Sequence, residues 1–308
     1  MKRIFQLGCA LGLSAAMLAC AGKPKQQVLY PPPFPDKEAP DLWKGESIST
    51  PIVIDGTLEA AWLAAPVKTV WLRHAADGTR AFPVFLRALF DGDHVYLSAQ
   101  WPDLSDDSMP DRFVWNEGQL AYEPSSKAED MFAFSFQLKG ELQTTMLTTK
   151  GYEADVWHWK AGRGNGAGYA DDKRTIVSNT RISGGHAFDL YDGQQCWIAR
   201  PADAGSPAYS KRTPPLQFSG QKFEASYEEV KPSGSRGDVQ AKGVHHDGKH
   251  WTLEFKRRLN TGTDDDVIFR DRRDTPVTVA VWNNSKDLDH VVSQVLHLRL
   301  LAPLDGSE

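Results

Sequence analysis

The sequence has few cysteines, three in 308 residues. Cys9 and Cys20 both lie within the first twenty residues, which leaves Cys196 as the single thiol of the remaining chain. One thiol cannot form a disulfide framework, so the fold must be stabilised by a hydrophobic core. A lone cysteine in such a chain is most often simply buried.

Motifs of catalysis and of nucleic-acid binding are also missing. The sequence contains no nucleophile elbow, no phosphate-binding loop and no zinc signature. Its formal net charge of -5 and its pI of about 6.0 argue against nucleic acid as a partner. We therefore expect no catalysis by this chain alone.

The sequence has one long hydrophobic run, at its N-terminus. Lys2 and Arg3 precede an apolar stretch over residues 4–18, and small residues follow up to Cys20. This order predicts an export signal over residues 1–20. The sequence Met-Leu-Ala-Cys that ends at Cys20 resembles a lipoprotein signal, which predicts a lipid on Cys20 and a chain held at a membrane on the periplasmic side. The alternative is a plain secretory signal cleaved one residue before or after Cys20.

The chain has no segment with a long helical period. Residues 21–46 are rich in proline and read as a tether of polyproline character, and residues 303–308 form a short tail. Residues 47–302 between them alternate between apolar and polar positions in many short stretches, for example at Phe132, Phe134 and Phe136. Such spacing, with turn signals between the stretches, predicts an all-β, immunoglobulin-like β-sandwich with long loops over residues 161–250 and few short helices.

The stretch from Glu153 to Lys160 alternates most clearly. Trp157 and Trp159 fall on one face of the predicted strand and His158 on the other. Two tryptophans on one face predict either the wall of a ligand pocket or a part of the core. His158 is a possible ligand to a metal, although a histidine with satisfied hydrogen bonds is the more common case.

Two resemblances to known families narrow these alternatives. The segments IDGTLEAAW from Ile54 and ALFDGDHVYLSAQWPD from Ala88 resemble the start of sandwich domains in the family-nine carbohydrate-binding and DOMON-like group. Such domains bind sugars or haem, depending on their loops.

Four further blocks resemble, in the same order, the haem-binding domain of the ethylbenzene dehydrogenase gamma subunit. They are MLTTKGYEADVWHWKAGR from Met146, Asp171-Asp172, WTLEFKRRLNTG from Trp251 and VTVAVWNNSKDLDHVVS from Val277. Together with the opening they span residues 47 to about 302. The resemblance implies a haem b, an electron-transfer role, and a periplasmic redox protein or a molybdenum enzyme subunit as partner.

The resemblance also implies the two axial ligands of the haem iron. Met146 stands where the family has its methionine ligand, and His290, three residues before Ser293, stands where the gamma subunits have a lysine. An imidazole and a thioether hold iron six-coordinate, and the thioether raises its reduction potential. No CxxCH motif occurs, and residues 137–145 contain neither cysteine nor histidine, so the haem is expected to be bound without covalent attachment.

Other residues are expected around the same haem. Trp157, Trp159 and Trp282 are expected to flank the porphyrin, with His158 as an alternative ligand. Lys256, with the two arginines that follow it, is expected to pair with the propionates, although a solvated strand edge is an equally good interpretation.

A second function on the same fold remains open. In it the sandwich is a non-catalytic module that binds a carbohydrate or another small ligand, with Trp71, Trp101 or Trp157 as the stacking platform. Asp171-Asp172 and the acidic run over residues 264–266 lack the ligand spacing of a calcium loop, so both are interpreted as solvated turns.

Overall fold

A computed structural model describes residues 41–190, 192–246, 248–286 and 289–302. Over these residues the chain is almost entirely β, with one short α-helix, α1 (Ala60–Ala64), and one 3-10 turn, η1 (Ser235–Gly237). None of the described helices is long and apolar enough to cross a membrane. The predicted signal, most of the tether and the tail lie outside the described residues.

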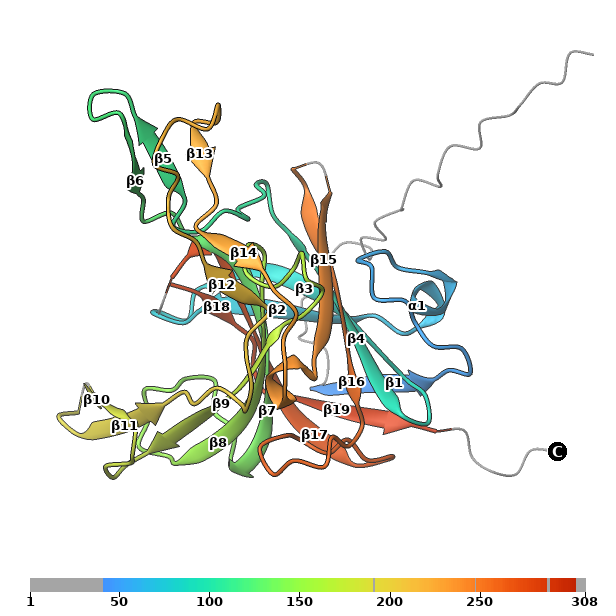
Figure 1. Ribbon diagram of the computed structural model, residues 1–308. Coiled ribbons are helices and arrows are strands. Elements are labelled where there is room, and N and C mark those ends of the chain that lie inside the picture. Colours follow the sequence, from blue (N-terminus) through green and yellow to red (C-terminus); the bar gives the residue numbers. More distant parts are fainter. Residues whose placement is uncertain (1–40, 191, 247, 287–288, 303–308) are drawn as a thin grey trace, which may run out of the picture. The chain divides into compact units, whose positions relative to one another are not determined.

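Fourteen strands form the main sheet, in the order β10-β11-β9-β8-β7-β17-β18-β2-β3-β4-β16-β15, with β1 and β19 joining at its side. Their bounds are β1 (Leu42–Ser47), β2 (Lys68–His74), β3 (Arg80–Phe90), β4 (His94–Pro102), β7 (Glu129–Gly140), β8 (Tyr152–Lys160), β9 (Asp171–Ser178), β10 (His186–Asp189), β11 (Gln195–Ala199), β15 (Gln240–His246), β16 (His250–Arg258), β17 (Asp274–Ser285), β18 (Val291–Val292) and β19 (Leu296–Leu301). Figure 1 shows β8 to β11 on one side of the view and β4, β15 and β16 on the other.

The first strand begins before the expected end of the tether. β1 pairs in parallel with β19 and with β3, and the Trp43 side chain is buried in the core. The tether was expected to run to residue 46, but Trp43 and Gly45 are both buried on either side of the exposed Lys44, which makes this segment a strand with a buried face. Among the described residues, the first strand therefore begins at Leu42, within the stretch expected to be tether.

The core lies between two layers of the main sheet. One layer contains β9, β8, β7 and β17 and the other contains β2, β3, β4, β16 and β15. Aromatic rings meet between them, with Trp101 of β4 at 5.3 Å from Phe132 of β7, and Phe255 of β16 at 5.2 Å from Phe134. This packing of one face on another confirms the predicted all-β sandwich.

Loops and two small sheets complete the fold. The small sheets are β12-β14 and β13-β5-β6, from β5 (Phe113–Asn116), β6 (Ala121–Pro124), β12 (Tyr209–Lys211), β13 (Phe223–Glu224) and β14 (Tyr227–Glu229). Between β9 and β15 the structure has only short strands and η1, as the glycine- and proline-rich sequence of this part predicts.

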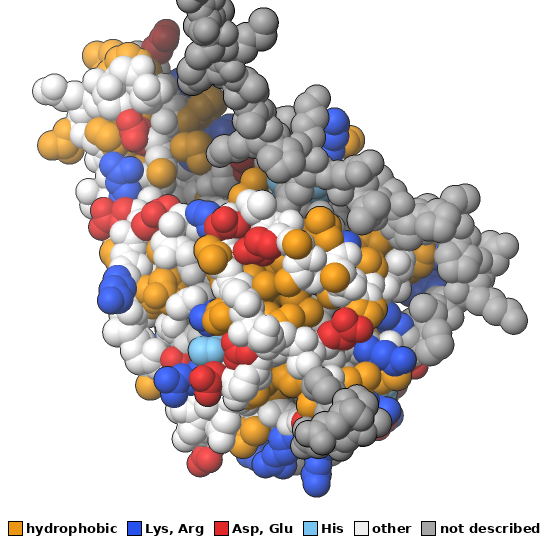
Figure 2. All heavy atoms as spheres, turned by 90° about the vertical axis from the view of Figure 1, so that its right-hand side faces the viewer, with side chains coloured by type: hydrophobic (Ala, Val, Ile, Leu, Met, Phe, Trp, Pro, Cys, Tyr) orange, Lys and Arg blue, Asp and Glu red, His pale blue; other side chains and the backbone are white. Residues whose placement is uncertain are grey.

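Exposed apolar side chains gather around α1. Val53, Leu63 and Val67 are among the most exposed large hydrophobic residues, and Figure 2 shows the hydrophobic side chains of this side interspersed with acidic and basic ones. None of the three lines the cavity described below. These residues are therefore separate from the site that follows.

Candidate functional site

A large cavity lies on the outer face of the layer formed by β7, β8, β9 and β17. Successive side chains of a strand point to opposite faces, so the residues that alternate with the core aromatics point away from the core. Many of these outward side chains are small and form the floor of the cavity. Four of these floor residues are Ala133, Ser135, Ala154 and Ala280. Short side chains leave a volume of about 1220 Å³ above the sheet, which exceeds the range of about 300–1,000 Å³ common for small-ligand sites.

The loop between β7 and β8 forms one side of this cavity and carries Met146. The Cys196 thiol of β11 donates to the Met146 carbonyl at 3.6 Å, and the Thr148 backbone N–H donates to the same oxygen at 3.0 Å. The Tyr152 hydroxyl donates to the Thr145 carbonyl at 3.3 Å. These bonds hold the loop over the sheet, and they give the buried thiol, Cys196, a structural role.

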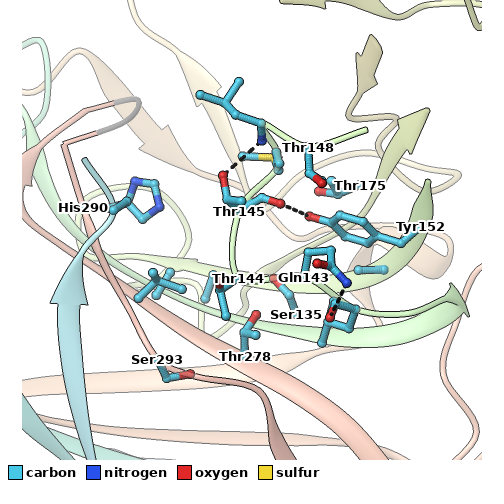
Figure 3. A pocket seen from close by; sticks show the side chains of 18 of the residues that line it. Ser135, Gln143, Thr144, Thr145, Thr148, Tyr152, Thr175, Thr278, His290 and Ser293 are labelled. Atoms are coloured by element: carbon cyan, nitrogen blue, oxygen red, sulfur yellow. Dashed lines mark hydrogen bonds between the residues drawn. The ribbon is translucent and has the colours of Figure 1, made fainter. Parts of the chain in front are cut away.

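His290 stands on the other side of the cavity, just before β18. Figure 3 shows it facing the hollow, with Tyr152 and Thr175 opposite and Ser135 and Thr278 below. Its imidazole stacks on Trp282 at 4.8 Å between ring centroids. The backbone N–H of Ala75 donates to the His290 carbonyl at 3.0 Å, which ties this position to the end of β2.

Trp282 lies between two histidines, because His158 of β8 packs against it at 5.1 Å. His158 Nδ1 is 2.6 Å from the Nζ of Lys173 on β9, while its Nε2 is buried without a hydrogen-bond partner. Burial, and then the positive charges of Lys173 and Lys160, lowers the pKa of His158 well below its usual value. The imidazole is therefore neutral, the form that binds metals.

Basic side chains border the cavity. Burial, and then the charge of Lys160, lowers the pKa of Lys173 to about 7. Arg73 and Arg200 are exposed where they line the same cavity, and Asp189 and Asp192 are acidic residues at its edge. An anionic group of a ligand would find three basic side chains around the cavity, Arg73 on β2, Lys173 on β9 and Arg200 just after β11.

The model of the ethylbenzene dehydrogenase family matches residues 59–292, which is most of the chain. The chain belongs to this family. The match confirms the resemblance found in the four sequence blocks, although no curated protein matches the sequence.

Two carbohydrate-binding proteins of known structure are similar, at low identity, to this member of the ethylbenzene dehydrogenase family. A family-nine carbohydrate-binding module from Caldicellulosiruptor kristjanssonii in complex with glucose has 9% identity and a TM-score of 0.38, covering 86% of this chain and 99% of its own. A putative carbohydrate-binding protein from Bacteroides uniformis has 8% identity and a TM-score of 0.37, covering 82% and 90%.

The structure of this ethylbenzene dehydrogenase family member brings together four of the predicted haem contacts. Met146, His158, Trp282 and His290 all line the one cavity. The residues present suit a haem in chemical terms, since a thioether, imidazoles and an aromatic ring surround a space of sufficient size. Met146 and His290 are 144 residues apart in the sequence, so their common position is a property of the fold.

Three predicted contacts lie elsewhere, and those expectations are corrected. Trp157 and Trp159 are fully buried in the core between the layers, because the face of β8 that they share is the inner one. Lys256 is on β16 in the other layer, where its Nζ lies 5.7 Å from the Tyr96 ring. The whole core separates it from the cavity, so it cannot pair with a group bound there.

The aromatic platform expected for a sugar is not present. Trp101 and Trp157 are buried in the core, and the Trp71 ring is covered by the Arg80 guanidinium at 3.6 Å. A stacking platform needs an open aromatic face. The tryptophans chosen for the alternative function therefore do not support it.

Sequence reasoning missed the residues that make the cavity. They are the small side chains of β7, β8 and β17 and the threonine-rich loop that ends at Thr149. A signal was present in Phe132, Phe134 and Phe136, which alternate with Ala133 and Ser135. A strand with large residues on one face and small ones on the other indicates a core on one side and free space on the other.

Proposed function

We propose that this chain binds haem b without covalent attachment in the cavity on β7, β8, β9 and β17, and that it passes electrons to or from a periplasmic redox enzyme. The observation that carries the proposal is that Met146 and His290 line the same cavity. Membership in the ethylbenzene dehydrogenase family supports it, and a molybdenum enzyme subunit is the partner we propose on that basis.

Each proposed ligand has neighbours that fix its position. Trp282 stacks on the His290 ring, and the Met146 carbonyl accepts from the Cys196 thiol and the Thr148 N–H. Met146 and His290 would hold the haem through a thioether and an imidazole, a ligand pair that supports one-electron transfer rather than substrate binding. The basic residues Arg73, Lys173 and Arg200 along the cavity would pair with the two propionates.

The proposal is tested by the absorption spectrum of the full chain produced with haem supply. We expect sharp α and β bands after reduction, and their loss in His290→Ala and in Met146→Ala, because either change removes an axial ligand. His158→Ala and His74→Ala remove histidines that line the same cavity and serve as matched controls.

The outcomes distinguish a wrong choice of ligands from a failure to bind haem at all. Bands that persist in His290→Ala but disappear in His158→Ala would move the ligand to β8 and contradict the proposed pair. A wild-type chain that binds no haem would contradict the function itself.

A further inference from the structure

Three carboxylates meet on the side of β8 and β9 that faces the core. They are Asp155 of β8, Asp172 of β9 and Asp266 of the segment before β17, with exposed fractions of 0%, 0% and 4%. One oxygen of each lies within 4.8 Å of the others. None of the three lines the haem cavity, so the cluster is a separate feature of the molecule. The interpretation of Asp171-Asp172 and of Asp266 as solvated turns is corrected, because all three are buried and the first two lie in β9.

Arg257 is the cation within this cluster. Its Nη1 donates to Asp155 Oδ2 at 2.6 Å and to Asp266 Oδ1 at 3.2 Å. Asp266 Oδ2 accepts from the Thr263 hydroxyl at 2.8 Å, and Asp155 Oδ2 also accepts from the Val267 N–H at 2.9 Å. These bonds use both oxygens of Asp266 but only one oxygen of Asp155.

Three carboxylate oxygens of the cluster are left without any partner. Both oxygens of Asp172 and the Oδ1 of Asp155 are buried and accept no hydrogen bond. Asp203 Oδ2 is a fourth unpartnered buried oxygen, on a residue whose charge acts on Asp172. A buried carboxylate without a partner is costly, so these oxygens require a group that the protein itself does not supply.

The charges of the cluster do not balance. Three carboxylates and one guanidinium leave two net negative charges in a buried site. A divalent cation would bring this total to zero, and it would meet the oxygens that Arg257 does not reach. Protons are the competing occupant, since burial raises the pKa of Asp172 well above its usual value.

We propose that Asp155, Asp172 and Asp266 form a structural calcium site that fastens β8 and β9 to the segment before β17. The donor set contains only oxygens, which favours calcium or magnesium over zinc or copper. Calcium accepts 6–8 oxygens at about 2.3–2.6 Å, so two oxygens on opposite sides of the ion can be almost 5 Å apart. Magnesium needs shorter bonds and keeps several waters, and a buried site made of protein oxygens suits it less.

The site is tested on the full chain after treatment with EDTA, by isothermal titration with Ca²⁺ alone and by thermal unfolding with and without Ca²⁺. We expect one bound Ca²⁺ per chain and a higher midpoint of unfolding in its presence, because a ligand that binds only the folded state stabilises it. Asp172→Asn keeps the shape of the side chain and removes its charge, and we expect calcium affinity to fall by at least about tenfold.

Asp264→Asn is the matched control, because Asp264 is an exposed member of the same acidic run. Its affinity should equal that of the wild type. Tb³⁺ gives a second readout that needs no change in stability. The Trp157 ring lies 4.7 Å from the Arg257 guanidinium, so excitation of tryptophan should sensitise Tb³⁺ luminescence in the wild type but not in Asp172→Asn.

The results that overturn the proposal are specific. Absence of binding at millimolar Ca²⁺, equal binding by Asp172→Asn and the wild type, or a preference for Mg²⁺ would each contradict a calcium site. Stabilisation by lower pH alone, with no effect of Ca²⁺, would show that protons neutralise the cluster. All of these measurements are independent of haem, so their failure leaves the proposed function untouched.

Discussion

Two histidines show how the surroundings decide what one residue type does. His158 lies beside the cavity with Lys173 on its Nδ1, whereas His250, at the start of β16, stacks on His246 at 4.5 Å in a buried position. Neither ring nitrogen of His250 has a hydrogen-bond partner. Protonation of His250 would place a positive charge in a buried position where neither ring N–H has a hydrogen-bond acceptor.

His250 therefore makes stability depend on pH. Burial, and then the charges of His246, His245 and Lys249, lowers the pKa of His250 to about 4 from the usual 6.5. The unfolded chain takes up this proton first, so stability is complete above pH 6.5 and is lost as the pH falls towards 4. We expect His250→Phe to reduce the loss of unfolding free energy between pH 7 and pH 5 by roughly 1–2 kcal/mol, measured by urea denaturation.

The control for this change is His186→Phe, which alters an exposed histidine on β10. It should leave the dependence of unfolding free energy on pH as it is in the wild type. An equal loss between pH 7 and pH 5 in His250→Phe and the wild type would show that His250 does not titrate in the folded protein as described.

Strands β7 and β17 separate the core from the cavity by the size of their side chains. On β17, Val279 and Val281 are buried in the core while Thr278 and Ala280 line the cavity. A larger side chain at Ala280 would occupy the cavity without entering the core. Strand β17 can therefore be substituted on its cavity face while its core face continues to stabilise the fold.

We expect Ala280→Phe to prevent haem binding while the protein stays folded. The ring would fill space above the floor of the cavity, and haem affinity should fall by at least about tenfold, equivalent to 1.4 kcal/mol. Haem titration followed by absorbance measures the affinity, and circular dichroism checks the fold. Ala60→Phe, at an exposed position of α1, is the control. Normal haem binding by Ala280→Phe would show that haem binds outside this cavity.

The sequence was sufficient for the class of fold because strand alternation is local. The alternation that includes Phe132 and Phe134 indicates a strand without any knowledge of the segments that pack against it. The same alternation placed Trp157 and Trp159 on one face but could not tell which face is the core. That choice depends on the other layer, which brings Phe255 within 6.2 Å of Trp157.

The sites were harder to predict from the sequence than the fold was. Met146 and His290 were chosen through the family resemblance, since nothing in the local pattern connects positions so far apart. The cluster of Asp155, Asp172 and Asp266 has no regular spacing, because the pairing of β8 with β9 and the position of a loop bring it together. Contacts set by tertiary structure leave no periodic trace in the sequence.

On the scale of the whole molecule, the two proposed sites lie on opposite faces of the same strands. β8 carries His158 towards the haem cavity and Asp155 towards the calcium cluster, and β9 likewise carries Lys173 and Asp172. A cation that holds β8 and β9 in place would also hold the floor of the cavity. The two sites are therefore expected to stabilise one another through these strands.

The N-terminal sequence predicts where the whole molecule acts. A lipid on Cys20 would anchor the chain, since each buried methylene contributes about 0.8 kcal/mol and more than one acyl chain gives stable attachment. We expect Cys20→Ser to move the protein from the membrane fraction to the soluble periplasmic fraction, measured by fractionation of cells that produce it. Cys9→Ser is the matched control and should stay in the membrane fraction. Both variants should keep the haem spectrum of the wild type, because both residues precede the predicted sandwich domain in the sequence. A Cys20→Ser protein that stays in the membrane fraction would contradict lipidation at Cys20 as the anchor.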